Sequence, residues 1–168
     1  MHYPAQQVVV HRNVDLSMNV PDFDRRYCAS LQSVAECSDA FARWMQAAAL
    51  PRSLAEPLSL ALEELLVNIV AHGCAQDERC TFSVAAVCSA EGVVLTLRDD
   101  GAGFDPTRAR APDIHAPLAQ REPGGLGLWL VHHLVDKLTY RRVGDENELT
   151  LNKRYTAGGS AAASDATG

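Results

Sequence analysis

Apolar residues recur at the three-to-four-residue spacing of an α-helix in three segments of the chain. The first of these segments starts at Ser33, which forms a capping box with Glu36, and continues to Pro51. Its apolar positions are Val34, Cys37, Phe41, Trp44 and Ala48. This spacing predicts an amphipathic helix that begins at the capping box.

The second helical segment is rich in leucine and is the most regular of the three. The predicted helix begins at a second capping box, Ser53 with Glu56, and ends at Gly73. We place Pro57 in the first turn, where a helix tolerates proline. The third segment, 126–138, resumes the helical spacing after a long interruption.

Alternating apolar and polar residues predict the strands. The strands fall in two hairpins, one around the turn Ala90–Gly92 and one around the turn 144–147, and in two short segments near the N-terminus. The predicted strands are 8–10, 23–28, 81–89, 93–99, 138–143 and 148–155. Between the hairpins, residues 101–125 are punctuated by proline and glycine and carry no periodicity, which indicates a long, functional loop.

This order of elements predicts helices packed on one face of a mixed, mainly antiparallel sheet, which is a two-layer α+β sandwich. With 168 residues the chain has the length of one domain. We expect an N-terminal extension over 1–22, a folded domain over 23–155 and a disordered tail over 156–168, because the tail is small and polar.

Charge and composition narrow the function classes. The formal net charge of −6 argues against direct nucleic-acid binding, because an acidic surface does not attract phosphate backbones. The N-terminus lacks the apolar core of a signal peptide, and no apolar stretch is long enough to span a bilayer. We therefore expect a cytoplasmic protein that does not enter a membrane.

The five cysteines cannot all pair and none lies in a CxxC motif, which favours a reducing compartment. A zinc site at His72, Cys74 and Cys80 would have only three ligands at a spacing that matches no zinc motif, so idle thiols are favoured. His132 and His133, on the third helix, are expected to be surface or packing residues.

Three short motifs could carry chemistry. On the second helix, Glu64, Asn68 and His72 are four residues apart and fall on one stripe. The carboxylate of Glu64 and the carboxamide of Asn68 offer oxygen ligands, which suit Mg²⁺, an ion that takes few protein ligands and completes its shell with water and phosphate. An exposed polar edge of the helix would show the same spacing.

The second motif, Asp99-Asp100-Gly101-Ala102-Gly103, directly follows an apolar strand. Glycines let a flat ring approach the backbone, and a carboxylate can accept a hydrogen bond from the exocyclic amine of adenine. A simple turn is the alternative, because Asp-Gly is a common turn pair.

The third motif, Gly124-Gly125-Leu126-Gly127-Leu128, leads into the helix that contains Trp129. Free backbone N–H groups and the positive end of the helix dipole make such a segment a phosphate site. Its spacing matches neither a P-loop nor a Rossmann fingerprint. A flexible hinge is the alternative.

Taken together, these motifs resemble the Bergerat-type (GHKL) ATP-binding domain of gyrase, histidine kinases and MutL, and within it the anti-sigma factor serine/threonine kinases. The resemblance is carried by three blocks, LALEELLVNIVAHG, LRDDGAGFDP and GGLGLWLVHHLVDKLTYRR, and by ELTLNKR near the end of the domain. These blocks lie within residues 60–154.

The resemblance implies a role for each motif. Glu64 matches the general base, Asn68 the ligand of Mg²⁺, and Asp99 the acceptor for the adenine amine. Gly101 and Gly103 would shape the adenine pocket, and Gly124 through Leu128 would form the phosphate side. Residues 105–123 correspond to the ATP lid, in which Arg108, Arg110, His115 and Arg121 are candidates to contact the γ-phosphate. A threonine that helps to bind adenine in this superfamily has no clear match, and both Asn147 and Thr150 stay open.

The implied activity is ATP- and Mg²⁺-dependent serine/threonine protein kinase activity in a partner-switching module. The substrate of the kinase would be a small STAS-type anti-anti-sigma protein. The kinase itself would also sequester a sigma factor or another regulator of transcription. The resemblance also implies a homodimer. A noncatalytic, nucleotide-dependent binding switch is the alternative, and the catalytic fragment of a histidine kinase lacks support because no two-helix dimerisation element precedes the domain.

Overall fold

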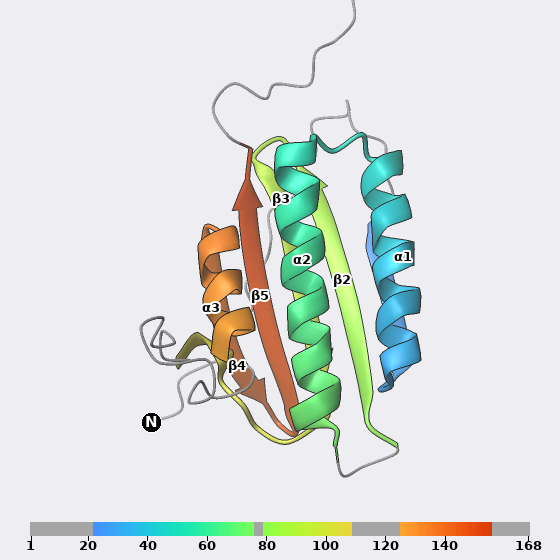
Figure 1. Ribbon diagram of the computed structural model, residues 1–168, viewed down its shortest axis with the longest axis vertical. Helices are drawn as coiled ribbons and strands as arrows, with labels where there is room; N and C mark the ends of the chain where they lie inside the picture. Colours follow the sequence, from blue (N-terminus) through green and yellow to red (C-terminus); the bar gives the residue numbers. More distant parts are fainter. Residues whose placement is uncertain (1–21, 76–78, 109–124, 156–168) are drawn as a thin grey trace, which may run out of the picture.

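A single five-stranded sheet forms one layer of the molecule (Figure 1). The computed structural model describes residues 22–75, 79–108 and 125–155. The strands are β1 (Phe23–Cys28), β2 (Thr81–Ser89), β3 (Gly92–Asp99), β4 (Lys137–Val143) and β5 (Glu146–Arg154). Their order is β1-β2-β3-β5-β4, and each pairing among these described strands is antiparallel.

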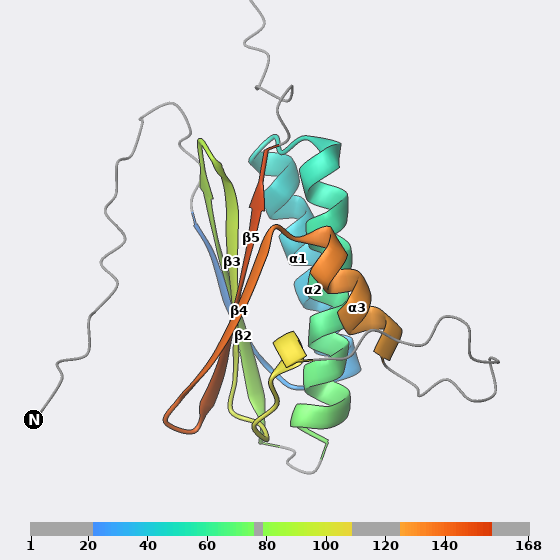
Figure 2. The same ribbon diagram turned by 90° about the vertical axis from the view of Figure 1, so that its left-hand side faces the viewer.

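Three helices cover one face of this sheet (Figure 2). They are α1 (Leu31–Ala47), α2 (Arg52–Asn68) and α3 (Gly125–Leu134). The predicted two-layer α+β architecture is confirmed, with both hairpins at the expected places. The predicted strand at 8–10 and the predicted tail at 156–168 lie outside the described residues.

Alternation along each strand divides the apolar core from the outer face of the sheet. In β3, for example, Val93, Leu95 and Leu97 are buried against the helices, whereas Thr96 is half-buried on the other face. The leucine stripe of α2 and the aromatic side chain of Phe41 on α1 complete the core. Burial of these apolar side chains is the main force that holds the helices on the sheet.

Both predicted capping boxes were wrong. Helix α1 begins three residues earlier than expected, because the Ser30 hydroxyl accepts the N–H of Ser33 at 3.1 Å and so caps the first turn. Helix α2 begins after Pro51 without a side-chain cap, and Glu56 pairs with Arg52 instead of returning to Ser53.

Pro57 lies in the second turn of α2, not the first as predicted, so its missing N–H removes one hydrogen bond of the helix.

Helix α2 changes geometry at its C-terminal end. After Asn68 the chain forms a π-helical turn, η1 (Ile69–Gly73), in which the N–H of Cys74 donates to the carbonyl of Ile69 at 2.8 Å. The extra residue in this turn alters the helical spacing beyond Asn68.

Candidate functional site

A pocket lies between the helical layer and the sheet, where β3 ends and β5 begins. Most of its walls are apolar, and the polar side chains are few and come from separate segments. The lining residues are Leu65, Asn68, Ile69, Gly73, Leu97, Asp99, Ala102, Phe104, Pro106, Leu128, Tyr140, Asn147 and Leu149. All three motifs singled out in the sequence therefore contribute to one pocket.

Glu64 and Asn68 lie one turn apart on α2 and are both half-buried. The Nδ2 of Asn68 donates to the backbone carbonyl of Glu64 at 2.7 Å. This bond commits the nitrogen to the helix and leaves Oδ1 as the oxygen that can ligate a cation. His72 lies in the π turn that follows, where it is exposed and does not line the pocket, so the structure does not bring it to the pocket with Asn68.

Helix α3 packs against α2 at Glu64. A Cβ added to Gly127 would lie 2.2 Å from Oε2 of Glu64, so the absence of a side chain lets the carboxylate rest against the first turns of α3. The positive end of the α3 dipole favours a negative charge there. The packing of the two helices thus brings the first motif next to the third.

The third motif is largely part of α3 rather than a loop before it. Gly125 is the first residue of the helix, and Leu128 is buried and lines the pocket. Leu126 is 58% exposed and does not line the pocket, which does not support its predicted place in the site. Gly124 lies outside the described residues.

Asp99, the last residue of β3, is a buried carboxylate that lines the pocket. Its Oδ1 accepts the N–H of Gly101 at 3.0 Å and the Nδ2 of Asn147 at 2.8 Å. Burial raises the pKa of Asp99, and these two hydrogen bonds oppose the rise. Both bonds engage the same oxygen, so Oδ2 is the atom that can accept a further donor.

The neighbouring Asp100 has a structural role instead. Its carboxylate accepts the N–H of Thr81 at 2.6 Å and the hydroxyl of the same residue at 2.8 Å. These bonds lower the pKa of Asp100, although desolvation, the largest contribution, acts in the opposite direction. Only the first aspartate of the pair is therefore available to the pocket.

Of the two glycines in this motif, Gly101 is the one at which a side chain would collide with its neighbours. A Cβ on Gly101 would lie 2.5 Å from the carbonyl oxygen of Gly73, whose carbonyl also accepts the N–H of Ala102 at 2.9 Å. Gly103 is exposed, and a Cβ there would meet Arg142 only at an ordinary 3.5 Å. Neither glycine lines the pocket, so the structure does not support the pocket-shaping role that the resemblance implied for them.

Asn147 was one of two residues left open by the sequence, and the structure places it in the pocket. It is paired with Asp99 across β3 and β5, whereas Thr150 pairs with Thr96 on the outer face of the sheet. Its position could have been found from the sequence, because it alternates with Leu149 and so shares the apolar face of the strand.

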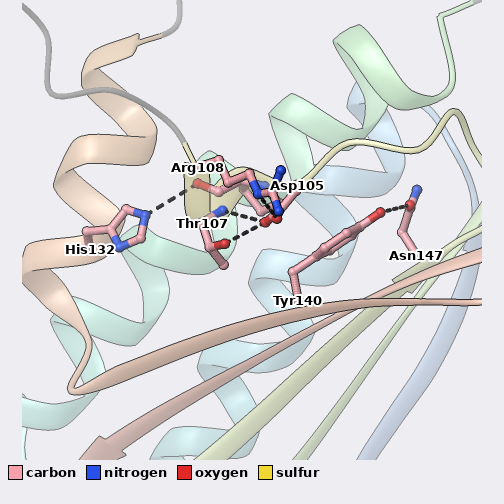
Figure 3. A network of polar contacts seen from close by, with 7 residues as sticks. Asp105, Thr107, Arg108, His132, Tyr140 and Asn147 are labelled. Carbon is pink, nitrogen blue, oxygen red and sulfur yellow. Dashed lines mark hydrogen bonds and ion pairs between the residues drawn. The ribbon is translucent and has the colours of Figure 1, made fainter.

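The carboxamide of Asn147 makes four hydrogen bonds. Its Nδ2 donates to Asp99 and, at 3.0 Å, to the carbonyl of Ala102, while its Oδ1 accepts the hydroxyl of Tyr140 and Nη1 of Arg142, both at 2.8 Å. Figure 3 shows the Tyr140 side chain directed towards Asn147. Tyr140 and Arg142 lie in the third block of the resemblance but had been given no role there; they hold the side chain that orients Asp99.

The beginning of the predicted lid is anchored near the pocket (Figure 3). Asp105 accepts the N–H and the hydroxyl of Thr107 and pairs with Arg108 at 3.2 Å, which holds the short 3₁₀ helix η2 (Pro106–Arg108). His132 of α3 contacts the carbonyl of Pro106 at 3.3 Å, a packing role that agrees with the prediction. Arg110, His115 and Arg121 lie outside the described residues.

The expectation of idle thiols was wrong for Cys74 and Cys80, which form a disulfide. The π turn and the start of β2 bring their Cα atoms to 5.5 Å, an ordinary separation for a disulfide. These sulfurs and a carboxylate oxygen of Asp100 also form the one cluster of potential metal ligands in the part of the chain that the structure describes. His72 is not a member of that cluster, and two sulfurs bonded to each other are not thiolate ligands.

A family model for the histidine kinase-like ATPase domain matches residues 27–153. This match includes every residue that lines the pocket. The chain belongs to the histidine kinase-like ATPase domain family. Among its described helices, none is long and apolar enough to cross a membrane.

One curated protein is similar to this chain in sequence, and one solved structure is similar to it in fold. This histidine kinase-like ATPase domain is 35% identical over 94 residues to the serine/threonine-protein kinase BtrW of Bordetella bronchiseptica, a stretch that covers 56% of this chain and 66% of BtrW. Its fold is similar to the crystal structure of the RsbU and RsbW domains of Rv1364c from Mycobacterium tuberculosis, with a TM-score of 0.59 and 19% identity. That likeness covers 80% of this chain and 32% of the other.

Proposed function

We propose that this protein is an ATP- and Mg²⁺-dependent serine/threonine protein kinase of the anti-sigma type. The observation that carries the proposal is one pocket lined by Asn68, the buried Asp99 and Leu128 of α3, with Glu64 close by at Gly127 in the first turn of α3. A kinase needs these three parts, a base, a nucleotide pocket and an anion-binding helix terminus, in one place.

The pocket suits an adenine ring in its chemistry. Leucine and isoleucine side chains would contact the flat ring, and Oδ2 of Asp99 would accept a hydrogen bond from the exocyclic amine. The enclosed cavity measures about 40 Å³, which is room for a few water molecules. Adenine would therefore enter as the 48% exposed Phe104 at its rim moves aside.

The residues beside the pocket also fit a magnesium ion. Mg²⁺ prefers one or two protein oxygens together with phosphate and water, and Oδ1 of Asn68 is such an oxygen. When bound, Mg²⁺ would neutralise charge on the triphosphate. The N–H groups in the first turn of α3 would contribute to the same end, because they carry the positive end of the helix dipole.

Glu64 is the group that we expect to act on the acceptor hydroxyl. It would take the hydroxyl proton while the serine or threonine oxygen bonds to the γ-phosphorus and the bond to the leaving ADP breaks. Its carboxylate lies beside Gly127 in the first turn of α3, which is the proposed phosphate side, and this proximity supports the assignment.

The proposed acceptor is a small STAS-type anti-anti-sigma protein, and the proposed sequestered partner is a sigma factor or another transcriptional regulator. The resemblance of the sequence motifs to anti-sigma factor kinases supports both, and the similarity to a serine/threonine-protein kinase supports a serine or threonine hydroxyl as the acceptor. We also propose a homodimer on the ground of that resemblance, and the cytoplasmic location expected from the sequence stays a proposal. A phosphate added to the acceptor would release it through its negative charge.

The test is phosphoryl transfer from radiolabelled Mg-ATP to a purified STAS-domain protein of the same organism, with the affinity for ADP measured in parallel. Glu64→Gln should reduce the transfer rate at least about a hundredfold, the usual contribution of a general base, with ADP affinity unchanged. Glu63→Gln is the matched control, because Glu63 is the adjacent, exposed carboxylate on the same helix.

Three outcomes would contradict the proposal in different ways. Nucleotide-dependent binding of the STAS protein without any transfer would support the noncatalytic switch. Equal transfer by wild type and Glu64→Gln would exclude Glu64 as the base while leaving kinase activity in place. Label that is lost in acid would indicate a phosphohistidine product and so a histidine kinase reaction.

A further inference from the structure

The Cys74–Cys80 disulfide joins the two segments that support one end of the pocket. Cys74 follows the π turn η1, and Cys80 precedes β2. Both cysteines are buried, at 8% and 3% exposure, while the adjoining Ala75 and Arg79 are exposed. The bond therefore lies just beneath the surface.

Each cysteine is next to a residue that holds the segment from Asp99 to Ala102. Before Cys74, the carbonyl of Gly73 accepts the N–H of Ala102 at 2.9 Å, and Gly73 itself lines the pocket. After Cys80, Thr81 donates its N–H and its hydroxyl to Asp100. The carbonyl of Thr81 also accepts the N–H of Asp100 at 3.3 Å. The disulfide thus connects the two supports of the segment that carries the adenine acceptor.

We propose that Cys74 and Cys80 are a reversible oxidation site that sets the affinity of the pocket for nucleotide. The inference deepens the proposed function and rests on its nucleotide-binding part. The oxidant is a low-molecular-weight disulfide. One cysteine thiolate attacks that disulfide and releases one thiol, and the second cysteine displaces the other thiol as the protein S–S bond forms. Two protein thiols are oxidised and one small disulfide is reduced to two thiols, so electrons and protons balance.

The oxidised protein is the form with the higher affinity. With the bond in place, Gly73 and Thr81 keep their relative position, and the segment that carries Asp99 is held ready for the ligand. In the reduced form these two supports move more independently, and nucleotide binding has to order them. We expect ADP to bind about fivefold more tightly to the oxidised form, at the low end of typical couplings between two sites.

Thermodynamic reciprocity supplies a second readout. If the oxidised form binds ADP more tightly, ADP must stabilise the disulfide by the same factor. A fivefold difference corresponds to a decrease of about 20 mV in the reduction potential, since a tenfold change in a two-electron couple is about 30 mV. The potential of the cysteine pair should therefore fall on addition of saturating Mg-ADP.

The experiment compares oxidised and reduced full-length wild-type protein in a glutathione buffer. Three quantities are measured: hydrogen exchange of the Ala102 amide without nucleotide, the affinity for Mg-ADP, and the fraction of disulfide with and without Mg-ADP. A zinc-selective chelator keeps the reduced thiols and Asp100 from binding metal. Because wild-type protein is used in both states, the comparison does not depend on the folding of a variant.

Two variants locate the effect. Cys74→Ser combined with Cys80→Ser should show no response to the glutathione ratio. Cys28→Ser removes an exposed thiol that belongs to neither the pocket nor the disulfide, and it should respond like wild type. We expect reduction to speed the exchange of the Ala102 amide several-fold, because its hydrogen bond to Gly73 opens more often.

The outcomes separate this inference from the proposed function. Equal Ala102 exchange and equal ADP affinity in the two redox states would overturn the oxidation-site inference and leave the kinase proposal intact. Faster Ala102 exchange on reduction, with tighter ADP binding in the oxidised form, would support it. If neither state binds ADP, the proposed function fails, and the affinity part of this inference fails with it.

Discussion

Replacing Asn147 with alanine should disrupt the polar network that orients Asp99. The substitution removes all four hydrogen bonds of the carboxamide, which is only 5% exposed in the folded protein. Two of the partners, Asp99 and Arg142, are ionisable groups, and the other two are the Tyr140 hydroxyl and the Ala102 carbonyl. The variant therefore leaves a buried carboxylate with one fewer donor.

The partners differ in how far water can replace the lost bonds. Arg142 is exposed and Tyr140 is half-buried, so water can take up much of their loss. Asp99 is 7% exposed, and a lost hydrogen bond to a buried charged group costs about 1.5–3 kcal/mol. With the loss at Ala102 added, we expect the free energy of unfolding to fall by about 3 kcal/mol at neutral pH. The pKa of Asp99 should also rise further, because Asn147 opposes the effect of burial.

Urea denaturation of Asn147→Ala, Tyr140→Phe and Thr150→Ala measures these contributions. Tyr140→Phe removes one neutral hydrogen bond and should lower the unfolding free energy by about 1 kcal/mol. Thr150 is on the other face of the same strand, and its variant should change the unfolding free energy by less than about 0.5 kcal/mol. A loss below about 1 kcal/mol for Asn147→Ala would refute the view that its amide stabilises the Asp99 carboxylate.

Three other predictions follow from single contacts. Gly101→Ala places a Cβ against the carbonyl of Gly73 and should lower the unfolding free energy by about 1–3 kcal/mol in the same assay. Gly103→Ala is the control, and an equally large loss in that variant would contradict the steric argument. Burial raises the pKa of Asp99, so this carboxylate becomes protonated earlier than usual as the pH is lowered, and ADP affinity should then fall. Calorimetric titration that shows no such fall would exclude Asp99 as the acceptor. Glu148 has a pKa below 4.5 because it binds arginines of β3 and β4, so its pairing stabilises the fold above pH 4.5 and is lost as the pH falls through the lower folded value. Glu148→Gln should therefore be less stable than wild type at neutral pH, and thermal melts should show the two converging in acid.

The elements of this protein followed from the sequence because their signals are local. Alternation of side chains along a strand and their recurrence along a helix reflect one buried face each, and the structure has both hairpins and three helices in the expected order. The ends were less exact: α3 stops at Leu134, short of the predicted 138, because β4 begins at Lys137, and α2 begins after Pro51 without a side-chain cap. At the start of α1, Ser30 and Ser33 can each form a cap. The contact that Ser30 makes with Ser33 selects one of them in the folded chain.

The candidate site was also visible in part from the sequence. The motifs identified Asn68, Asp99 and Leu128, and all three line the pocket. Tyr140 and Arg142 lie at the end of the third block, but no role was inferred for them, because their role depends on how the β4–β5 hairpin lies against the end of β3. No local pattern records such a contact.

What the sequence alone determined was therefore the set of elements, their order and the residue types able to bind a nucleotide, since each depends on neighbours a few positions away. The tertiary structure decided which of those residues meet. It selected Asn147 over Thr150 through the pairing of β3 with β5, left His72 exposed and outside the pocket, and brought Cys74 to Cys80. These results depend on strand register and on backbone geometry set by packing across the whole core, which residues far apart in the sequence determine together.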